Sequence, residues 1–423
     1  MAIAKNNAKD TNIVRDLAKR AAEIAALPVQ GEKRGMWRRL NDLDPVRPMV
    51  LIFGGGITWT EIDDDSLVER ASDPWYRAQE KYWRQLLFRW EHLPCDMVIE
   101  PFVECPMTII NTGCGFSGWK DNSLADRVIV NNTYKDIESR SFKPLIHSEA
   151  DLEKFRLPHI SVDRKSTNEN FEKTKDLYDG IFEVRLKGIT GGWHWPWNNI
   201  IAWLGIEESL IAMNDNPGLL HKIMRCVTDA ELSALDQYRQ LGLFSPSSGN
   251  GNTGNGGYAY SSELPSDGTV TGPQSLWCST AAEIFTCVSP QMHKEFALDY
   301  EIEVLQQYGL TYYGCCERLD HKIDILKNIP NLRKISVSTW TKPEIAASEI
   351  GNQYVYSYKP DNTGISSFSW DAEDTRKTLK DIVKSAQKNN CPIEIIMNAV
   401  STLHHEPRRI IEWARIAQKI AEG

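Results

Sequence analysis

The run Arg47-Pro-Met-Val-Leu-Ile-Phe-Gly-Gly-Gly56 decides the fold class of this chain. Its apolar residues follow one another without the alternation of a half-exposed strand, and a glycine loop ends the run. An uninterrupted apolar run is typical of a parallel strand that is covered on both faces. The run therefore predicts a buried parallel strand near residue 49 that leads directly into a loop.

The same unit recurs along the chain. Further strands are expected near residues 97, 182, 243, 310, 333, 354 and 393, with helical sequence between them. Eight alternating strand and helix units favour a closed (β/α)₈ TIM barrel over an open doubly wound sheet. No linker rich in Pro, Gly or Ser divides the chain. Residues 1–45 are therefore predicted to form an N-terminal helical extension, and residues 46–423 the barrel.

Composition and charge narrow the function classes. The 423 residues are 41% hydrophobic and 25% charged, as in a globular protein, and the formal net charge is −9. Such an acidic chain is unsuited to broad electrostatic contact with nucleic acid or an anionic membrane. No apolar run approaches the roughly 18 residues that span a bilayer, and no secretory signal opens the sequence. Nine cysteines without such a signal predict a reducing, cytoplasmic location.

A second stretch, Leu310-Thr-Tyr-Tyr-Gly-Cys-Cys-Glu317, ends a strand-like run in two thiols and a carboxylate. Three soft or anionic groups at a strand end suggest metal binding. The alternative is that the cysteines are small apolar side chains that fill the core. Cys315 is expected to point to the opposite side of the strand from Cys316, towards the core.

In a barrel of this kind the site is built at the C-terminal ends of the strands. Thiol, imidazole and carboxylate groups gather there in the pattern of a zinc site. The candidate ligands at these ends are Glu104, His194, Glu263, Cys315, Cys316, Glu317, His404 and His405. Each has a plainer interpretation as well. For example, Glu104 and Glu263 are equally suited to loop or helix-cap positions.

Tryptophan is concentrated in the segment Gly191-Gly-Trp-His-Trp-Pro-Trp197. Its rings are suited either to packing at the barrel rim or to an aromatic wall for a planar substrate. His194 could stack between its two neighbours and bond a main-chain carbonyl. The glycine- and asparagine-rich residues 245–257 are expected to form a functional loop. The predicted substrate-binding residues are Trp193, His194, Trp195, Trp197, Tyr313 and Asn398.

From about residue 45 onward the chain resembles the uroporphyrinogen decarboxylase superfamily, whose fold is a distorted (β/α)₈ barrel. The resemblance does not extend to the decarboxylases themselves. They carry an arginine-rich motif that binds the carboxylates of the substrate, whereas the loop here reads Ile52-Phe-Gly-Gly-Gly-Ile-Thr58. Their catalytic Asp is also missing from residues 99–104. The stretches that carry the resemblance are Arg47-Pro48, Val288-Ser-Pro-Gln-Met-His-Lys-Glu-Phe296, Gly314-Cys-Cys-Glu317, Lys334-Ile-Ser-Val-Ser338 and Glu406-Pro-Arg-Arg-Ile-Ile-Glu-Trp-Ala414.

The other branch of this superfamily consists of corrinoid-dependent methyltransferases, several of which bind Zn²⁺ through a His-x-Cys motif and a later Cys. Cys316 matches the first cysteine, but Gly314 stands at the His position and Val400 near the later Cys. Members that demethylate methoxylated aromatics use sets that mix carboxylate, His and Cys. The resemblance therefore implies a zinc site with an altered ligand set, for which the candidates are Cys316, Glu317, His404 and Glu263.

The activity implied by this branch is methyl transfer from a methoxylated, aromatic donor or another methylated donor to Co(I). A metal would act as the Lewis acid that stabilises the leaving oxygen. The chain lacks an Asp-x-His-x-x-Gly motif, so the corrinoid (cobalamin) is expected on a partner protein. Glu317 and Glu104 are the candidate catalytic carboxylates, with Glu317 open between ligand and general base. The chain would be the substrate-specific component of an O-demethylase, as a monomer or a homodimer.

Three other functions remain open on the sequence. The first is decarboxylation of a smaller carboxylated substrate, which would need no metal. The second is glycoside hydrolysis, in which Glu104 and Glu317 would lie about 5 to 9.5 Å apart across a cleft. The third is a non-catalytic barrel that only binds a corrinoid or tetrapyrrole. Metal content and methyl transfer to cob(I)alamin distinguish all three from the methyltransferase.

Overall fold

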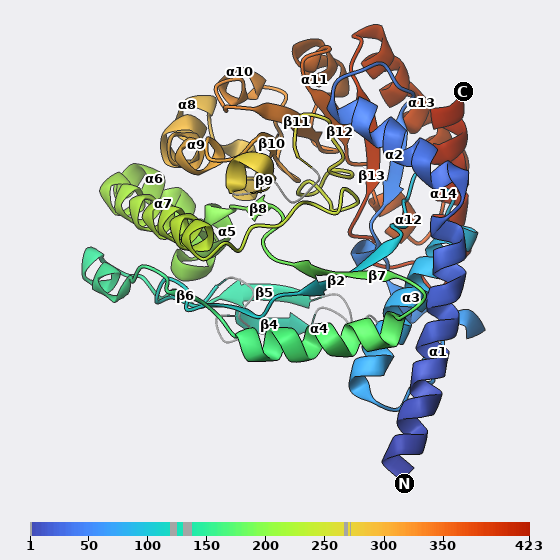
Figure 1. Ribbon diagram of the computed structural model, residues 1–423. Coiled ribbons are helices and arrows are strands. Elements are labelled where there is room, and N and C mark those ends of the chain that lie inside the picture. The colour runs from blue at the N-terminus through green and yellow to red at the C-terminus, as the bar shows by residue number, and fades with distance from the viewer. Residues whose placement is uncertain (1, 119–124, 130–137, 266–269, 271) are drawn as a thin grey trace.

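The structure is a computed structural model that describes residues 2–118, 125–129, 138–265, 270 and 272–423. Its centre is a seven-stranded parallel sheet in the order β1-β13-β12-β11-β10-β9-β8 (Figure 1). The predicted mixed α/β class with a parallel sheet is confirmed, but the seven strands of this sheet do not close into the predicted (β/α)₈ barrel. The strands of this sheet are β1 (Met49–Ile52), β8 (Gly192–Trp193), β9 (Trp277–Thr280), β10 (Leu310–Tyr313), β11 (Leu332–Val337), β12 (Val355–Tyr358) and β13 (Ile393–Met397).

Strand β1 is the apolar run with which the prediction began. All four of its residues are buried, and it pairs in parallel with β13 from Met49 opposite Glu394 to Ile52 opposite Met397. Helices cover the outer face of the curved sheet (Figure 1). Because helices bury that face and a loop fills the other, the strand can be apolar at every position.

Three smaller sheets flank the main one. They pair β2 (Phe102–Pro106) with β7 (Glu183–Lys187) in parallel, and β3 (Ile109–Asn111) with β6 (Ile160–Val162) and β4 (Ala125–Ile129) with β5 (Glu138–Phe142) in antiparallel. The helices are α1 (Ala2–Ala25), α2 (Pro28–Asn41), α3 (Pro74–His92), α4 (Arg164–Tyr178), α5 (Pro196–Leu204), α6 (Ile206–Asp215), α7 (Pro217–Gln240), α8 (Pro290–His293), α9 (Asp299–Leu305), α10 (Ile323–Leu326), α11 (Pro343–Ile350), α12 (Thr363–Ser366), α13 (Ala372–Lys388) and α14 (Arg408–Glu422). Over the described residues, none of these helices has the length and apolar character needed to cross a membrane.

Two of the expected strands are wrong in detail. Residues 97–99 are buried but form no ladder, because the Ile99 amide donates to Gln30 Oε1 at 3.0 Å and the Val98 amide contacts the Tyr258 hydroxyl. The strand of this unit begins later, at Phe102. Near residue 243 there is only one bridge, between Ile189 and Phe244.

Strand β9 was not predicted. Its sequence, Trp277-Cys-Ser-Thr280, has two hydroxyl residues in place of a continuous apolar run. Ser279 and Thr280 are both buried. The Ser279 hydroxyl accepts a hydrogen bond from the Trp195 indole at 3.3 Å, which satisfies it in the core. The polar residues therefore hide a strand that the apolar pattern alone cannot reveal.

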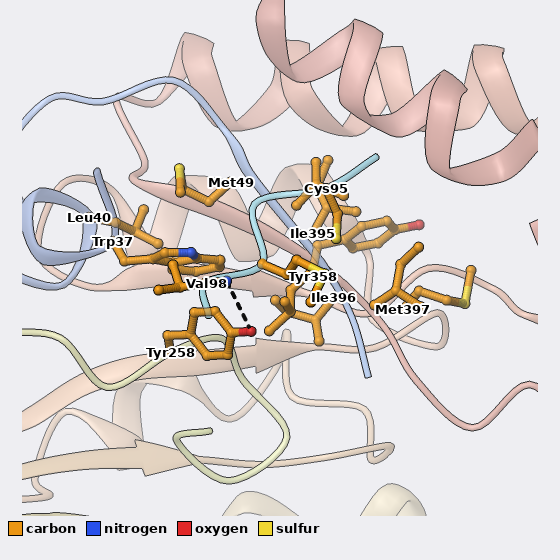
Figure 2. Close-up of a cluster of buried hydrophobic side chains, with 14 of the residues drawn as sticks. Trp37, Leu40, Met49, Cys95, Val98, Tyr258, Tyr358, Ile395, Ile396 and Met397 are labelled. Carbon is orange, nitrogen blue, oxygen red and sulfur yellow. Dashed lines mark hydrogen bonds between the residues drawn. The ribbon is translucent and has the colours of Figure 1, made fainter. Parts of the chain in front are cut away.

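Helix α2 packs onto the sheet, and helix α1 packs against α3. Figure 2 shows Trp37 and Leu40 of α2 in the same apolar cluster as Ile395 and Ile396 of β13. The Trp37 ring lies 5.3 Å from the ring of Tyr258, measured between centroids. Helices α1 and α2 span Ala2–Ala25 and Pro28–Asn41, and the side chains of Val14, Trp37 and Leu40 belong to the main core cluster.

The inner face of the sheet carries a buried polar network. Lys334 of β11 pairs with Glu394 of β13 at 2.9 Å, and both side chains are fully buried. Ser357 of β12 donates to Glu394 at 2.6 Å and accepts from Lys359 at 2.7 Å. Burial acts to raise the Glu394 pKa, but the two lysines and Ser357 outweigh it and lower that pKa. The network fixes three neighbouring strands from the inside.

The predicted glycine- and asparagine-rich loop fills the space beside this network. The Gly257 amide donates to Glu394 Oε1 at 3.0 Å. A Cβ atom on Gly256 would lie 2.7 Å from the Tyr312 ring, and one on Gly257 would lie 2.3 Å from the Trp37 ring. The loop can approach the sheet this closely only because it lacks side chains at these positions.

Replacing Gly257 with alanine is therefore expected to destabilise the protein. The added methyl group would overlap Trp37, which is fully buried, and overpacking of this kind costs about 1–3 kcal/mol. Urea unfolding measures the change. Gly218→Ala is the control, because a Cβ there meets no atom within 4 Å. Equal stability of the two variants would contradict the tight packing of the loop.

Candidate metal centre

Three ligand atoms meet where strands β9 and β10 end. The Cys315 and Cys316 sulfur atoms lie 3.3 Å apart. Together with a carboxylate oxygen of Glu283 they form a group whose atoms all lie within 4.8 Å of one another. Glu283 opens the 3₁₀ segment η7 (Glu283–Cys287), three residues after β9. The parallel register of β9 and β10, with Thr280 opposite Tyr313, brings the two segments together.

The expectation that Cys315 points away from Cys316 is wrong. Strand β10 ends at Tyr313, so the alternation of side chains no longer applies two residues later. Gly314 turns the chain with φ of 98°, and a Cβ there would lie 2.6 Å from Leu319. Cys315 is buried beside Trp195 as expected for a core residue, yet its sulfur faces Cys316.

This donor set fits zinc. In a tetrahedral site with Zn–S bonds of roughly 2.3 Å, two thiolate sulfurs lie about 3.8 Å apart. The observed 3.3 Å separation requires only a small adjustment. Two sulfurs and one carboxylate oxygen would leave a fourth position for substrate, as in catalytic zinc sites. Cys316 is exposed, so the ligand group reaches the surface of the protein.

The surroundings favour a thiolate on Cys316. The hydrogen bond from Cys315 lowers the pKa of Cys316, burial and Glu283 oppose that shift, and Lys359 lowers the pKa further. The Cys315 pKa is raised, because its thiol proton is shared with Cys316 and its side chain is buried. Asn255, from the glycine-rich loop, donates to the Cys315 sulfur at 2.6 Å. The loop thus contacts the metal centre directly.

Glu317 lies behind the thiols and is not one of the clustered ligands among the described residues. Its side chain is fully buried, and one oxygen accepts the Cys315 amide at 2.8 Å. Burial raises the Glu317 pKa to about 7. In this position Glu317 holds the turn that carries both thiols, and its catalytic role stays a prediction.

Two predicted ligands lie elsewhere. Glu263 forms a two-point ion pair with Arg333, at 2.7 and 2.9 Å, near the start of β11. That is the opposite end of the sheet from Cys316, so the structure does not bring Glu263 together with Cys316. His404 places Nε2 2.9 Å from the Ser366 carbonyl oxygen and lies outside the cluster found in the described residues. It follows β13, four strands away from β9 in the sheet order.

The predicted aromatic wall is only partly exposed. Trp193 and Trp195 stack at 4.4 Å between centroids, and Trp193 is 53% exposed. Trp197, in contrast, is fully buried, and its indole donates to the Phe296 carbonyl at 3.0 Å. The structure therefore places Trp197 in the core and not beside Trp193 at the surface. Its proline-capped helix α5 turns the side chain into the core.

The other predicted substrate residues fall into different surroundings. His194 is buried, and burial lowers its pKa to about 4, so its ring is neutral at pH 7. Tyr313 is fully buried with its hydroxyl bonded to His293, which removes it from any open pocket. Asn398 follows β13 and accepts a hydrogen bond from Asn362 through its carbonyl oxygen at 3.3 Å.

Glu104 lies in a cleft beside the loop that follows β1, at the end of the sheet where the strands end. It pairs with Lys187 at 2.5 Å. Two adjoining cavities, of about 370 and 210 Å³, share Lys187, Gly251 and Asn252 in their linings. The larger cavity begins at the β1 loop, and the smaller one ends at Trp193 and at Ser279 of β9.

Comparisons with known proteins give a limited result. No family model matches the chain, and no curated protein sequence matches it. Among solved structures, a methyltransferase from Methanosarcina mazei superposes over 92% of this chain and 97% of its own. The sequence identity is 9% and the TM-score is 0.47. A likeness this distant carries no inference about chemistry.

A buried carboxylate near the metal centre predicts a pH dependence of stability. Burial raises the pKa of Glu301, in α9, to about 8. The unfolded value is about 4.3, so between these values the folded chain holds a proton that the unfolded chain has lost. Stability is therefore expected to fall as pH rises from about 4 to 8.

Glu301→Gln should remove the share of this pH dependence that Glu301 causes, a change on the order of 2 kcal/mol or more between pH 5 and pH 8, whereas the raised pKa of Glu317 contributes its own share in both proteins. Urea unfolding at the two pH values measures it. Glu303→Gln is the control on the same helix, because Glu303 is 38% exposed and pairs with Arg225 at the surface. If the wild type and Glu301→Gln vary equally with pH, Glu301 does not titrate as described.

Proposed function

We propose that this chain is a methyltransferase, the substrate-specific component of a corrinoid-dependent O-demethylase system. It would move a methyl group from a methoxylated donor to the Co(I) of a corrinoid carried by a partner protein. The single observation that carries the proposal is the group formed by Glu283, Cys315 and Cys316 at the ends of β9 and β10. The resemblance of the sequence to the methyltransferase branch supports the same activity.

In this proposal, Glu283, Cys315 and Cys316 hold the zinc ion. When bound, zinc would supply Lewis-acid stabilisation to the oxygen from which the methyl group departs. The residues of the chain prepare the site. The hydrogen bond from the Cys315 thiol and, to a smaller extent, Lys359 lower the Cys316 pKa and favour a thiolate ligand. The Asn255 bond to the Cys315 sulfur and the Glu317 bond to the Cys315 amide would hold Cys315 in place before substrate binds.

The corrinoid partner would dock over the loops that follow the strands. Two large aromatic side chains are exposed there, Trp340 after β11 at 71% and Phe368 after α12 at 95%. Exposed aromatic residues are enriched at protein interfaces. If β2 and β7 complete a barrel on the open side of the sheet, the loops that follow the strands would form the mouth of that barrel. The cleft between Glu104 and Trp193 would then lie inside the mouth. A cytoplasmic location and a monomer or homodimer complete the proposal.

Methyl transfer to free cob(I)alamin tests the function. Under anaerobic conditions, the zinc-loaded protein is mixed with cob(I)alamin and a panel of methoxyarenes, methylamines and methanol. Conversion to methylcobalamin, followed by absorbance, is expected with at least one methoxyarene. No conversion with any donor would contradict the proposal. Release of carbon dioxide from a carboxylated donor without methyl transfer would favour a decarboxylase instead.

A further inference from the structure

One arginine in the cleft has no acidic partner among the described residues. Arg89, near the end of α3, lines the larger cavity. Its Nη2 atom donates to the Ile52 carbonyl oxygen at 2.6 Å, which leaves the positive charge uncompensated. Its Nε atom is buried and has no acceptor in the described structure. A partly buried guanidinium in this state requires an anion to balance its charge.

The glycine loop after β1 makes room for this arginine. A Cβ atom on Gly54 would lie 2.8 Å from Arg89 Nη1, whereas one on Gly55 would meet no atom within 4 Å. The guanidinium therefore sits directly beside Gly54, and the loop leaves open space next to it. The Trp59 indole donates to the Gly54 carbonyl oxygen at 2.8 Å, which fixes the loop in this position.

The remaining polar groups of this cavity add donors without cancelling the charge. Glu104 and Lys187 face the cavity as an ion pair and neutralise each other. The Tyr258 hydroxyl oxygen accepts the Val98 amide at 3.5 Å, so its proton is available to another acceptor (Figure 2). The larger cavity is thus cationic by one charge, with a phenol donor beside it.

We propose that the cleft beside Arg89 binds a carboxylate of the substrate, so that the methyl donor is a methoxylated aromatic acid. This inference rests on the proposed function. A guanidinium recognises carboxylate through two parallel N–H bonds. The two adjoining cavities lead from Arg89 to Trp193 and to Ser279 of β9, the strand that precedes Glu283. The acid group would bind at one end and the methyl ether towards the metal centre.

Benzoate and benzyl alcohol test this site without any methyl transfer. Isothermal titration calorimetry of the wild-type protein is expected to show benzoate binding and at least 10-fold weaker binding of benzyl alcohol. Arg89→Gln should weaken benzoate binding by about 10- to 100-fold and leave benzyl alcohol unchanged. Arg89→Lys keeps the charge but loses the two-point contact, so an intermediate loss is expected.

Arg77→Gln is the matched control. Arg77 lies on the same helix and donates to a main-chain carbonyl, that of Ala71 at 2.9 Å, but does not line the cavity. It should bind benzoate as the wild type does. Equal affinity of the wild type for benzoate and benzyl alcohol would overturn the inference, even if Arg89→Gln failed to fold. So would unchanged benzoate binding in folded Arg89→Gln.

The two proposals fail separately. Arg89-dependent benzoate binding without methylation of cob(I)alamin by any methoxybenzoate leaves the carboxylate site standing and removes the methyltransferase. In the opposite case, uncharged methoxyarenes methylate cob(I)alamin faster than methoxybenzoates do, and Arg89→Gln leaves these rates unchanged. That result would support the methyltransferase and remove the carboxylate site.

Discussion

Replacing Cys316 with serine is expected to abolish zinc binding and methyl transfer together. The substitution removes one of three clustered ligand atoms and replaces a thiolate with a hydroxyl, a poor ligand for zinc. Zinc affinity should fall on the order of 100-fold or more. Mass spectrometric metal analysis after dialysis measures the zinc content, and the cob(I)alamin assay measures the activity.

Cys287→Ser is the control for this experiment. Cys287 is also exposed and ends the short segment that Glu283 begins, but it is not a member of the ligand group. Its replacement should leave zinc content and activity unchanged. Glu283→Gln should resemble Cys316→Ser in both measurements, since it removes the only carboxylate of the group. Full zinc content in Cys316→Ser would show that zinc binds elsewhere in the protein.

Among the stability variants proposed for this protein, Lys334→Met is expected to lower the free energy of unfolding the most. Its partner Glu394 would keep its charge in a fully buried position without the cation that contacts it directly, and removing one partner of a buried ion pair costs about 3–5 kcal/mol. The double variant Lys334→Met/Glu394→Gln should recover much of this loss, because glutamine is neutral and can keep the bond from Ser357. Urea unfolding compares the two variants.

Lys165→Met provides the comparison at the surface. Lys165 lies 3.9 Å from Glu169 on α4, and the two side chains are 85% and 65% exposed. Its loss should change the free energy of unfolding by less than about 1 kcal/mol. If Lys334→Met were no more harmful than Lys165→Met, the buried network would not stabilise the sheet as described.

The sequence predicts most strands of the parallel sheet correctly, but it does not predict whether that sheet closes into a barrel. An uninterrupted apolar run identifies β1, and a mostly apolar run identifies β13, in which Glu394 is the one charged residue, because strands buried on both faces are rich in apolar side chains. The same rule overlooks β9, in which Ser279 and Thr280 are buried. It also predicts a strand at residues 97–99, where the amides of Val98 and Ile99 bond side chains instead of a neighbouring strand.

The candidate site shows the same limit. Cys316 could be predicted as a ligand because it comes just after a strand and stands next to a second thiol in the sequence. Glu283 could not be found, because its position depends on β9, which was not predicted. Glu263 was assigned to the wrong end of the sheet because the loop that carries it folds back towards the start of β11. Arg89 gives no signal either, since it resembles any other arginine of an amphipathic helix.

One measurement tests the central claim, that a metal held by the thiol pair supports methyl transfer. The rate of cob(I)alamin methylation is followed for a single preparation of the protein as purified, after removal of zinc with a chelator, and after zinc is returned. We predict that the rate with a methoxybenzoate is lost on chelation and restored by about one zinc ion per chain. An undiminished rate in the metal-free protein would contradict the claim.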